Sequence, residues 1–173
     1  MKILVASFTQ NNPYQGQLID QLRVQGQAVD TLAVTRILPL TVGRYDILHL
    51  HWLHTFFRGG YAVSRLLRLV YSMLMLLIAR LSGTRIVWTV HNLRAHETNY
   101  PQLDAVMTAW VVRLAHGFIV HCEWAKQELL KAHPKIDPDQ VRVIAHANYA
   151  EAYEENTDSA AARASLGIPA THT

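Results

Sequence analysis

The stretch IVWTVHN, residues 86–92, decides the fold of this chain, because an almost fully apolar run ends there in two polar residues. Such a run, rich in β-branched residues, is typical of a strand buried on both faces of a parallel sheet. Three further stretches repeat the pattern of an apolar run followed by histidine: ILHLHW (47–52), FIVHCE (118–123) and VRVIAHAN (141–148). If these strands lie parallel in one sheet, their histidines emerge at one carboxyl edge, where open α/β sheets bind ligands. The four histidines are His51, His91, His121 and His146.

Apolar runs alternate with longer segments of helical period, which predicts an α/β fold with a Rossmann-like, doubly wound parallel sheet of about six strands. We expect strands at residues 2–8, 28–34, 45–51, 85–91, 117–122 and 141–145. Flanking helices are expected at 14–26, 60–82, 101–115 and 123–133. From residue 150 the composition becomes polar. We therefore predict one domain over 1–149, followed over 150–173 by a linker with a short helix at 160–166 that opens the hinge to a second domain.

The composition limits the classes of partner. The chain has 173 residues, half of them hydrophobic, which suits one large domain or half of a two-domain enzyme. Sixteen Lys and Arg against thirteen Asp and Glu give a formal charge of +3, too weakly basic for a nucleic-acid binder. An anionic small ligand or an anionic membrane surface fits this charge better. Cys122 has no second cysteine to pair with, and the apolar run at residues 1–6 is too short for a signal peptide, so we expect a cytoplasmic protein.

His91 is the principal candidate for contact with a reacting group. A neutral imidazole at the mouth of the sheet can exchange a hydrogen bond with a sugar hydroxyl, and a protonated one can pair with phosphate. His96 and Glu97, on the loop that follows, can supply a base or accept a hydrogen bond from a hydroxyl. The alternative is that His91 holds a backbone carbonyl and that His96 and Glu97 are solvated loop residues.

The segment around His49, His51 and His54 has two interpretations. Residues two apart share a face of a strand, so His49 and His51 point the same way, while His54 lies in the loop beyond. An H-x-H pair binds zinc when His91 or Glu97 supplies a third ligand, which would make the chain a metal-dependent hydrolase that uses His49, His51 and His91. No H-E-x-x-H helix or cysteine pair supports that interpretation. We expect instead a rim of ligand-binding histidines without a metal.

The first turn of the predicted sheet, residues 7–16, contains one glycine, so a dinucleotide-type pyrophosphate cradle is not expected. Asn11 and Asn12 can present their amides to a carbohydrate, or they are ordinary turn and N-cap residues in front of a helix.

The helix expected at 60–82 has an uncharged apolar stretch from 69 to 79, shorter than the about 20 residues that span a bilayer. Arg58, Arg65, Arg68 and Arg80 surround it. Such a helix can lie in the headgroup plane, with its arginines on anionic lipid. The alternative is a crossover helix that packs entirely on the sheet.

With these residues in view, the chain resembles the amino-terminal domain of a GT-B glycosyltransferase, close to the family-4 group. DILHLHW (46–52) is similar to the third strand of that group, and WTVHN (88–92) with His96 and Glu97 is similar to its fourth strand and loop. The remaining matching segments are 118–123 with 125–129, 141–144 and 163–169.

The resemblance implies a half-domain that binds the acceptor, and a separate carboxyl-terminal domain, expected on another polypeptide, that binds the nucleotide sugar. It implies sugar transfer to a lipid-linked or polysaccharide acceptor only when both halves are present, with no cofactor bound by this chain alone. His91 would face the transferred sugar, and the loop from Asn92 to Glu97 would border the acceptor. His51 and His96 would lie on the acceptor side, while His121 and His146 would shape the rim.

The main alternative function is a non-catalytic module that docks on an intact glycosyltransferase or on a membrane. Either function would place the protein in the cytoplasm, peripheral to the inner face of the membrane.

Overall fold

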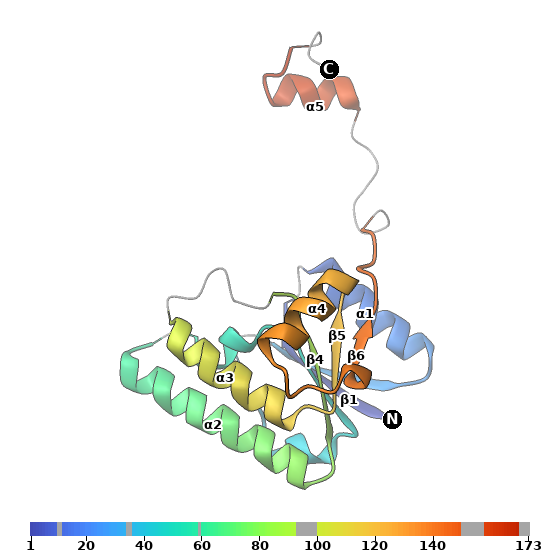
Figure 1. Ribbon diagram of the computed structural model, residues 1–173. Coiled ribbons are helices and arrows are strands. Elements are labelled where there is room, and N and C mark those ends of the chain that lie inside the picture. The colour runs from blue at the N-terminus through green and yellow to red at the C-terminus, as the bar shows by residue number, and fades with distance from the viewer. Residues whose placement is uncertain (10–11, 34–35, 59, 93–99, 150–157, 170–173) are drawn as a thin grey trace.

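A computed structural model describes residues 1–9, 12–33, 36–58, 60–92, 100–149 and 158–169. These residues form one sheet of six parallel strands in the order β2-β1-β3-β4-β5-β6, flanked by helices (Figure 1). This architecture confirms the predicted Rossmann-like α/β class. The strands are β1 (Lys2–Phe8), β2 (Ala28–Ala33), β3 (Ile47–Leu50), β4 (Arg85–Thr89), β5 (Gly117–Val120) and β6 (Val141–Val143).

The helices agree with the expected ranges to within two residues at each end. They are α1 (Pro13–Val24), α2 (Ala62–Leu81), α3 (Pro101–Leu114), α4 (Glu123–Ala132) and α5 (Ser159–Ser165). Three short 3-10 helices were not predicted, because a single turn is too short to show a periodicity. They are η1 (Leu40–Arg44), η2 (Leu53–Phe57) and η3 (Pro138–Gln140).

Four strands end earlier than their apolar runs suggest. The predicted ends at 51, 91, 122 and 145 are wrong, since β3, β4, β5 and β6 end at Leu50, Thr89, Val120 and Val143. Each apolar run extends past the end of its strand, because residues beyond the last strand pairing stay buried. Val90, for example, is only 4% exposed. The four edge histidines therefore lie one to three residues beyond their strands, on the segments that leave the sheet.

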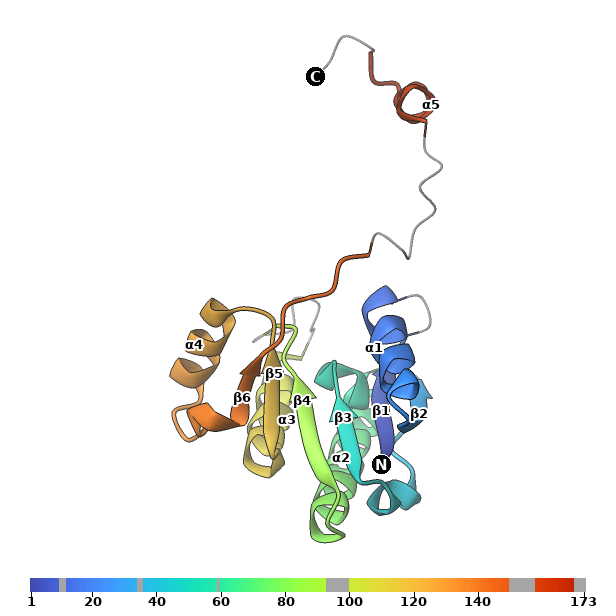
Figure 2. The same ribbon diagram turned by 90° about the vertical axis from the view of Figure 1, so that its right-hand side faces the viewer.

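The strand register divides the core into two layers. Leu48 and Leu50 of β3 pair beside Ile86 and Trp88 of β4, and these side chains form one large core with α2, α3 and α4. The opposite face of β1 and β2 packs on Ile19 of α1 in a smaller core. Figures 1 and 2 show α2 and α3 side by side on one face of the sheet and α1 on the other.

The same register explains where the histidines point. His49 pairs with Val5 of β1, which lies on the face that α1 covers. Because side chains alternate along an extended chain, residues two apart return to this face: His51 after His49, His91 after Thr89, and His121 after Ile119. Three histidines from three strands are thus directed to the side of the sheet where α1 begins.

The helix α5 lies apart from the sheet domain in both views (Figures 1 and 2). Asp158 caps its first turn by accepting a hydrogen bond from the amide of Ala160 at 3.0 Å. The division of the chain at residue 150 stays a prediction, because residues 150–157 are outside the described part of the chain.

Candidate functional site

The carboxyl edge of the sheet has a topological switch point between β1 and β3. The chain moves outward from β1 to β2 on one side, and from β3 through β4, β5 and β6 on the other. Connections that diverge in this way leave a crevice above the two strands, and open α/β sheets bind ligands in such crevices. The segments that follow β1 and β3 therefore border the candidate site.

Ser7, at the end of β1, joins these two segments. Its hydroxyl lies 2.7 Å from the hydroxyl of Thr55 and donates to the carbonyl of Trp52 at 3.2 Å. Ser7 has a φ of 65°, the only positive value among the non-glycine residues that the structure describes. Backbone strain of this kind persists only where the surroundings hold it, and it is concentrated at functional sites. These two hydrogen bonds supply that support at the switch point.

Gln15 attaches the start of α1 to the same strand end. Its side chain is fully buried, donates to the carbonyl of Ser7 at 3.3 Å and accepts from the amide of Thr9 at 2.8 Å. Asn12 accepts from the amide of Gln15 at 3.3 Å and caps the helix, as one of its two interpretations predicted. The first turn of α1 is therefore held rigidly over the edge.

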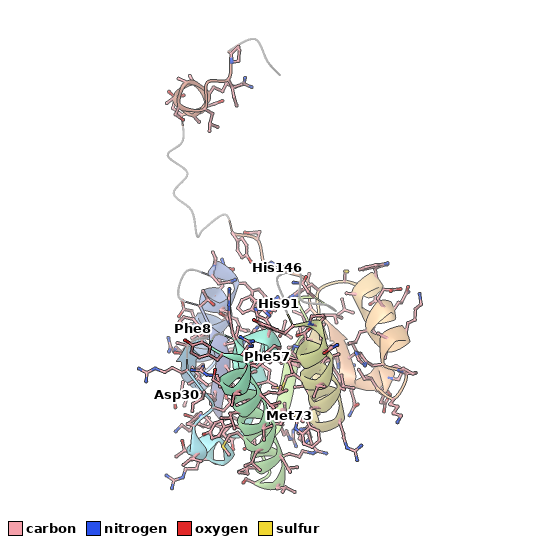
Figure 3. The ribbon with its side chains drawn as sticks, turned by 90° about the vertical axis from the view of Figure 1, so that its left-hand side faces the viewer. Phe8, Asp30, Phe57, Met73, His91 and His146 are labelled. Atoms are coloured by element: carbon pink, nitrogen blue, oxygen red, sulfur yellow. The ribbon has the colours of Figure 1, made fainter. Side chains whose placement is uncertain are left out.

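Four histidines meet at this edge, each from a different strand. Nδ1 of His51 lies 3.0 Å from Nε2 of His91, and the ring of His91 lies 5.3 Å from that of His121, centroid to centroid. The rings of His121 and His146 are 4.9 Å apart. Figure 3 shows His91 and His146 near each other at the edge where the chain leaves toward α5, with Phe57 beneath them. We call His51, His91, His121 and His146 the histidine cluster.

Tyr14 of α1 is the common neighbour of the histidine cluster. Its ring centroid lies 6.0 Å from His51, 5.2 Å from both His91 and His121, and 4.8 Å from His146. The first three contacts have the edge-to-face geometry that aromatic rings favour. Tyr14 thus fixes the relative positions of imidazoles that come from four separate strands.

Two further aromatic residues complete the wall. The indole of Trp52 stacks on His91 with a centroid distance of 4.8 Å and an interplanar angle of 16°. The hydroxyl of Tyr149 lies 3.1 Å from Nε2 of His146. Trp88, in the core below, donates to the carbonyl of His51 at 3.0 Å and so fixes the strand end. This edge of the sheet is therefore lined by aromatic rings and imidazoles.

Burial keeps the inner histidines neutral at pH 7. Desolvation, and to a smaller extent the neighbouring imidazoles His121, His146 and His49, lower the pKa of His91 to about 4. Desolvation, followed by the effect of His49, also places the pKa of His51 well below its ordinary value. A neutral imidazole carries one donor and one acceptor nitrogen, so His51 and His91 can exchange hydrogen bonds with hydroxyl groups in either sense.

Beneath the histidine cluster, His49 is connected to Tyr14 through Thr89. Nε2 of His49 lies 2.8 Å from the hydroxyl of Thr89, and desolvation lowers the pKa of His49 to about 4. Burial raises the pKa of Tyr14, while its hydrogen bond with Thr89 acts in the opposite direction. As predicted, His49 and His51 share a face, with their rings 4.5 Å apart. Because His49 is buried, its role is to support His51 and Thr89 from beneath the histidine cluster.

Two nitrogens of the histidine cluster are buried without a partner among the described residues. They are Nε2 of His51 and Nε2 of His121, whose Nδ1 lies 2.9 Å from the carbonyl of Ile144. A buried polar atom without a partner costs roughly 1–3 kcal/mol. A polar ligand at this edge would offset part of that cost, which is a reason to place substrate here.

The structure places the other predicted site residues as follows. His54 lies half-buried on η2, and Asn92 is exposed directly after His91. Asn11, His96 and Glu97 fall outside the described residues, so their roles stay predictions. Within the described part of the chain, no group of three or more His, Cys, Asp or Glu side chains is arranged to hold a metal ion.

No pattern in the sequence indicates that Tyr14, Trp52, Ser7 and Gln15 are parts of the site. Tyr14 and Gln15 follow Pro13, which starts the helix. A proline at the first helical position after a strand and turn does predict a helix start above the sheet edge. That signal identifies the location of these residues, while their contacts depend on strands distant in the sequence.

Tyr14→Ala is expected to raise the pKa of His91 from about 4 toward its ordinary 6.5, because removing the ring admits water to the histidine cluster. Tyr14→Phe is the matched control: it keeps the ring and loses only the hydrogen bond with Thr89, so the pKa of His91 should stay low. NMR titration of the imidazole nitrogens measures both. A pKa of His91 that is the same in Tyr14→Ala as in the wild type would show that Tyr14 does not shield the histidine cluster.

Comparison with known proteins gives two kinds of match. The sequence profile described as Glycosyltransferase Family 4 matches residues 25–147. A protein named GDP-mannose:glycolipid 4-beta-D-mannosyltransferase, from Xanthomonas campestris pv. campestris, is 33% identical over 108 residues, which cover 62% of this chain and 30% of that relative. The same protein of a second strain of that bacterium matches equally. The alignment thus spans less than a third of the relative's length.

Among solved structures, Anabaena HepE in complex with UDP-glucose aligns with a TM-score of 0.56 and 15% identity, over 96% of this chain and 50% of that one. The same protein in complex with UDP and glucose aligns with a TM-score of 0.54 and 16% identity over the same shares of the two chains. At this identity the likeness concerns the fold alone. This chain corresponds to about half the length of these structures.

Proposed function

Because the chain belongs to glycosyltransferase family 4, we propose that its carboxyl edge is the acceptor-side wall of a sugar-transfer site. The observation that carries this proposal is the convergence of four imidazoles, from four strands, around Tyr14 at the switch point of the sheet. In the proposed reaction, a sugar passes from a nucleotide sugar to a hydroxyl of a lipid-linked or polysaccharide acceptor.

The composition of the wall suits a carbohydrate. The neutral imidazoles of His51 and His91 can donate hydrogen bonds to sugar hydroxyls and accept them, and the aromatic faces of Trp52 and Tyr149 suit the apolar faces of sugar rings. Among the members of the histidine cluster, His91 is the proposed catalytic residue, in contact with the transferred sugar. His51, His121 and His146 are proposed to bind substrate beside it, and Asn92 borders the acceptor.

The low pKa of His91 indicates which role it plays. A general base works best with a pKa near the operating pH, and a group with a pKa of about 4 lies roughly three units below neutral pH. We therefore propose that His91 positions and hydrogen-bonds the reacting sugar. A donor phosphate beside it would raise its pKa, because a nearby negative charge favours the protonated imidazole.

GDP-mannose and a glycolipid are the first donor and acceptor to test, because the curated relative from Xanthomonas is named for them. The nucleotide sugar is proposed to bind a donor-binding half that closes over the histidine cluster as a separate domain or subunit.

A transfer assay tests this proposal. The chain is incubated with radiolabelled GDP-mannose, or with UDP-glucose as the alternative donor, and with glycolipids extracted from the source cells. Labelled glycolipid is expected only when a donor-binding half, such as the product of the adjacent gene, is added. Robust transfer by this chain alone would refute the need for a separate half. Absence of transfer with every donor in the combined preparation would favour a non-catalytic binding module.

A further inference from the structure

Helix α2 carries large apolar side chains on its exposed face. Five of them are spaced three, four or seven residues apart, which places them in one row along the helix. Each is between 50% and 77% exposed. We call them the α2 stripe: Val63, Leu67, Val70, Leu74 and Leu81.

The opposite face of α2 is already used by the fold. Leu69, Met75 and Leu76 are buried in the main core against the sheet and α3. The helix is therefore apolar on both faces. Packing in the core accounts for the apolar residues of the buried face but not for those of the exposed face. Helices of soluble proteins normally present charged and polar residues on the outer face.

By length and composition alone, α2 is a candidate to span a membrane, with a mean hydropathy of 1.7 over its best 18-residue window, of which 28% is buried. Its place in the fold argues against spanning. α2 is the crossover between β3 and β4, which are neighbours in the sheet, so it must stay packed on that sheet. Contact with a lipid surface through the outer face is compatible with this packing.

The charged residues along the chain on either side of α2 have one sign. Between Asp46 and Glu97 the chain has six arginines and no Asp or Glu. Arg58 precedes the helix, Arg68 lies in its second turn and Arg80 in its last turn, and all three are exposed. Arg65 is directed elsewhere, since its guanidinium lies 4.0 Å above the ring of Tyr100 and donates to the carbonyl of Gly60. An apolar row with cationic neighbours fits an anionic lipid headgroup layer.

We propose that the α2 stripe, flanked by Arg58, Arg68 and Arg80, docks this protein on the surface of an anionic membrane. A second copy of the chain is a poorer occupant, because stripe-to-stripe packing would bring these arginines together. α2 follows β3 and η2, so it begins on the side of the carboxyl edge of the sheet, where the histidine cluster lies. This arrangement would keep a lipid-linked acceptor within reach, but the docking does not depend on the proposed sugar transfer.

Sedimentation with lipid vesicles tests the docking. The chain is expected to sediment with phosphatidylglycerol vesicles at low salt, to be released by high salt, and to bind phosphatidylcholine vesicles weakly. The double variant Leu67→Gln/Val70→Gln should bind on the order of tenfold more weakly. Val24→Gln changes an apolar residue of α1 that is still more exposed than Leu67 and Val70, and it should bind as the wild type does. Arg58→Gln/Arg68→Gln should reduce the dependence on salt.

Three results would overturn this proposal. One is the wild-type chain remaining in the supernatant with phosphatidylglycerol at every salt concentration. Another is equal binding by the Leu67→Gln/Val70→Gln variant while circular dichroism shows both proteins folded. The third is a dimer, seen by light scattering, that this double variant abolishes and that does not bind vesicles, which would identify a second copy as the occupant. None of these results depends on the transfer assay.

Discussion

His91→Ala is expected to lower kcat/KM for sugar transfer about 10²- to 10³-fold in the enzyme assembled with its donor-binding half, because it removes a preorganised hydrogen-bonding group from the reacting sugar. The loss should appear in kcat more than in KM, since the interaction is proposed to act on the sugar as it transfers. His91→Gln, which keeps a side-chain donor and acceptor, should recover part of the rate. Steady-state kinetics with varied acceptor concentration provide the measurement.

A matched histidine outside the site provides the control for this experiment. His133 lies at the end of α4, so His133→Ala should leave kcat/KM unchanged. The proposed role of His91 is refuted by a folded His91→Ala enzyme that transfers sugar at the wild-type rate. That outcome would leave the histidine cluster as a binding surface and favour the non-catalytic module.

Acidification is expected to destabilise the fold strongly, because His49 is buried in its neutral form. Its folded pKa of about 4 lies below the ordinary value of 6.5. Between these two values the unfolded chain binds a proton that the folded chain does not bind. The free energy of unfolding is therefore complete above pH 6.5 and falls as the pH drops toward 4. The contribution of His49 to this loss is about 3 kcal/mol, and His51 and His91 act in the same direction.

Urea unfolding at pH 7, 5.5 and 4.5 measures this loss, with His49→Gln as the comparison. Glutamine does not titrate and can keep a hydrogen bond with Thr89. The free energy of unfolding of the His49→Gln variant should therefore fall less steeply with acid than that of the wild type. Near pH 5 the two slopes should differ by about 1.4 kcal/mol per pH unit. Parallel pH dependences in the two proteins would show that His49 does not control acid stability.

The sheet could be predicted because its signal is local. Each apolar run contains its own strand, and the histidine that follows each run indicates its carboxyl end. The ends themselves were placed too late, because residues such as Val90 are buried by neighbouring segments after strand pairing has stopped. Apolar residues in the sequence indicate which residues are buried, and buried residues continue beyond the hydrogen-bonded part of each strand.

The candidate site could be predicted only in part. The shared direction of His51, His91 and His121 follows from parallel strands and side-chain alternation, both visible in the sequence, and the position of His146 after the last strand places it at the same edge. Their dependence on Tyr14 was not visible, because that contact joins α1 to four strands far away in the chain. The neutral state of His51 and His91 also depends on this packing, since desolvation is the largest cause of both pKa shifts.

The residues of the proposed membrane-docking surface could also be predicted only in part. The sequence identified the arginines around α2 and an uncharged stretch from 69 to 79, but the α2 stripe begins earlier, at Val63. Which arginines remain available depends on α3, whose N-cap residue Tyr100 lies under the guanidinium of Arg65. Periodicity alone does not show which of two apolar faces packs on the sheet.

The binding of an acceptor saccharide to the histidine cluster is the central claim, and imidazole NMR of this chain tests it most directly. The saccharide portion released from the glycolipids of the source cells would be titrated into ¹⁵N-labelled protein. The account predicts saturable changes in the chemical shifts of the ring nitrogens of His91, His121 and His146. These changes should require more saccharide in Tyr14→Ala, and the ring nitrogens of His133 should not show them. Unchanged imidazole signals of the histidine cluster at saturating saccharide, or shifts confined to histidines elsewhere, would contradict it.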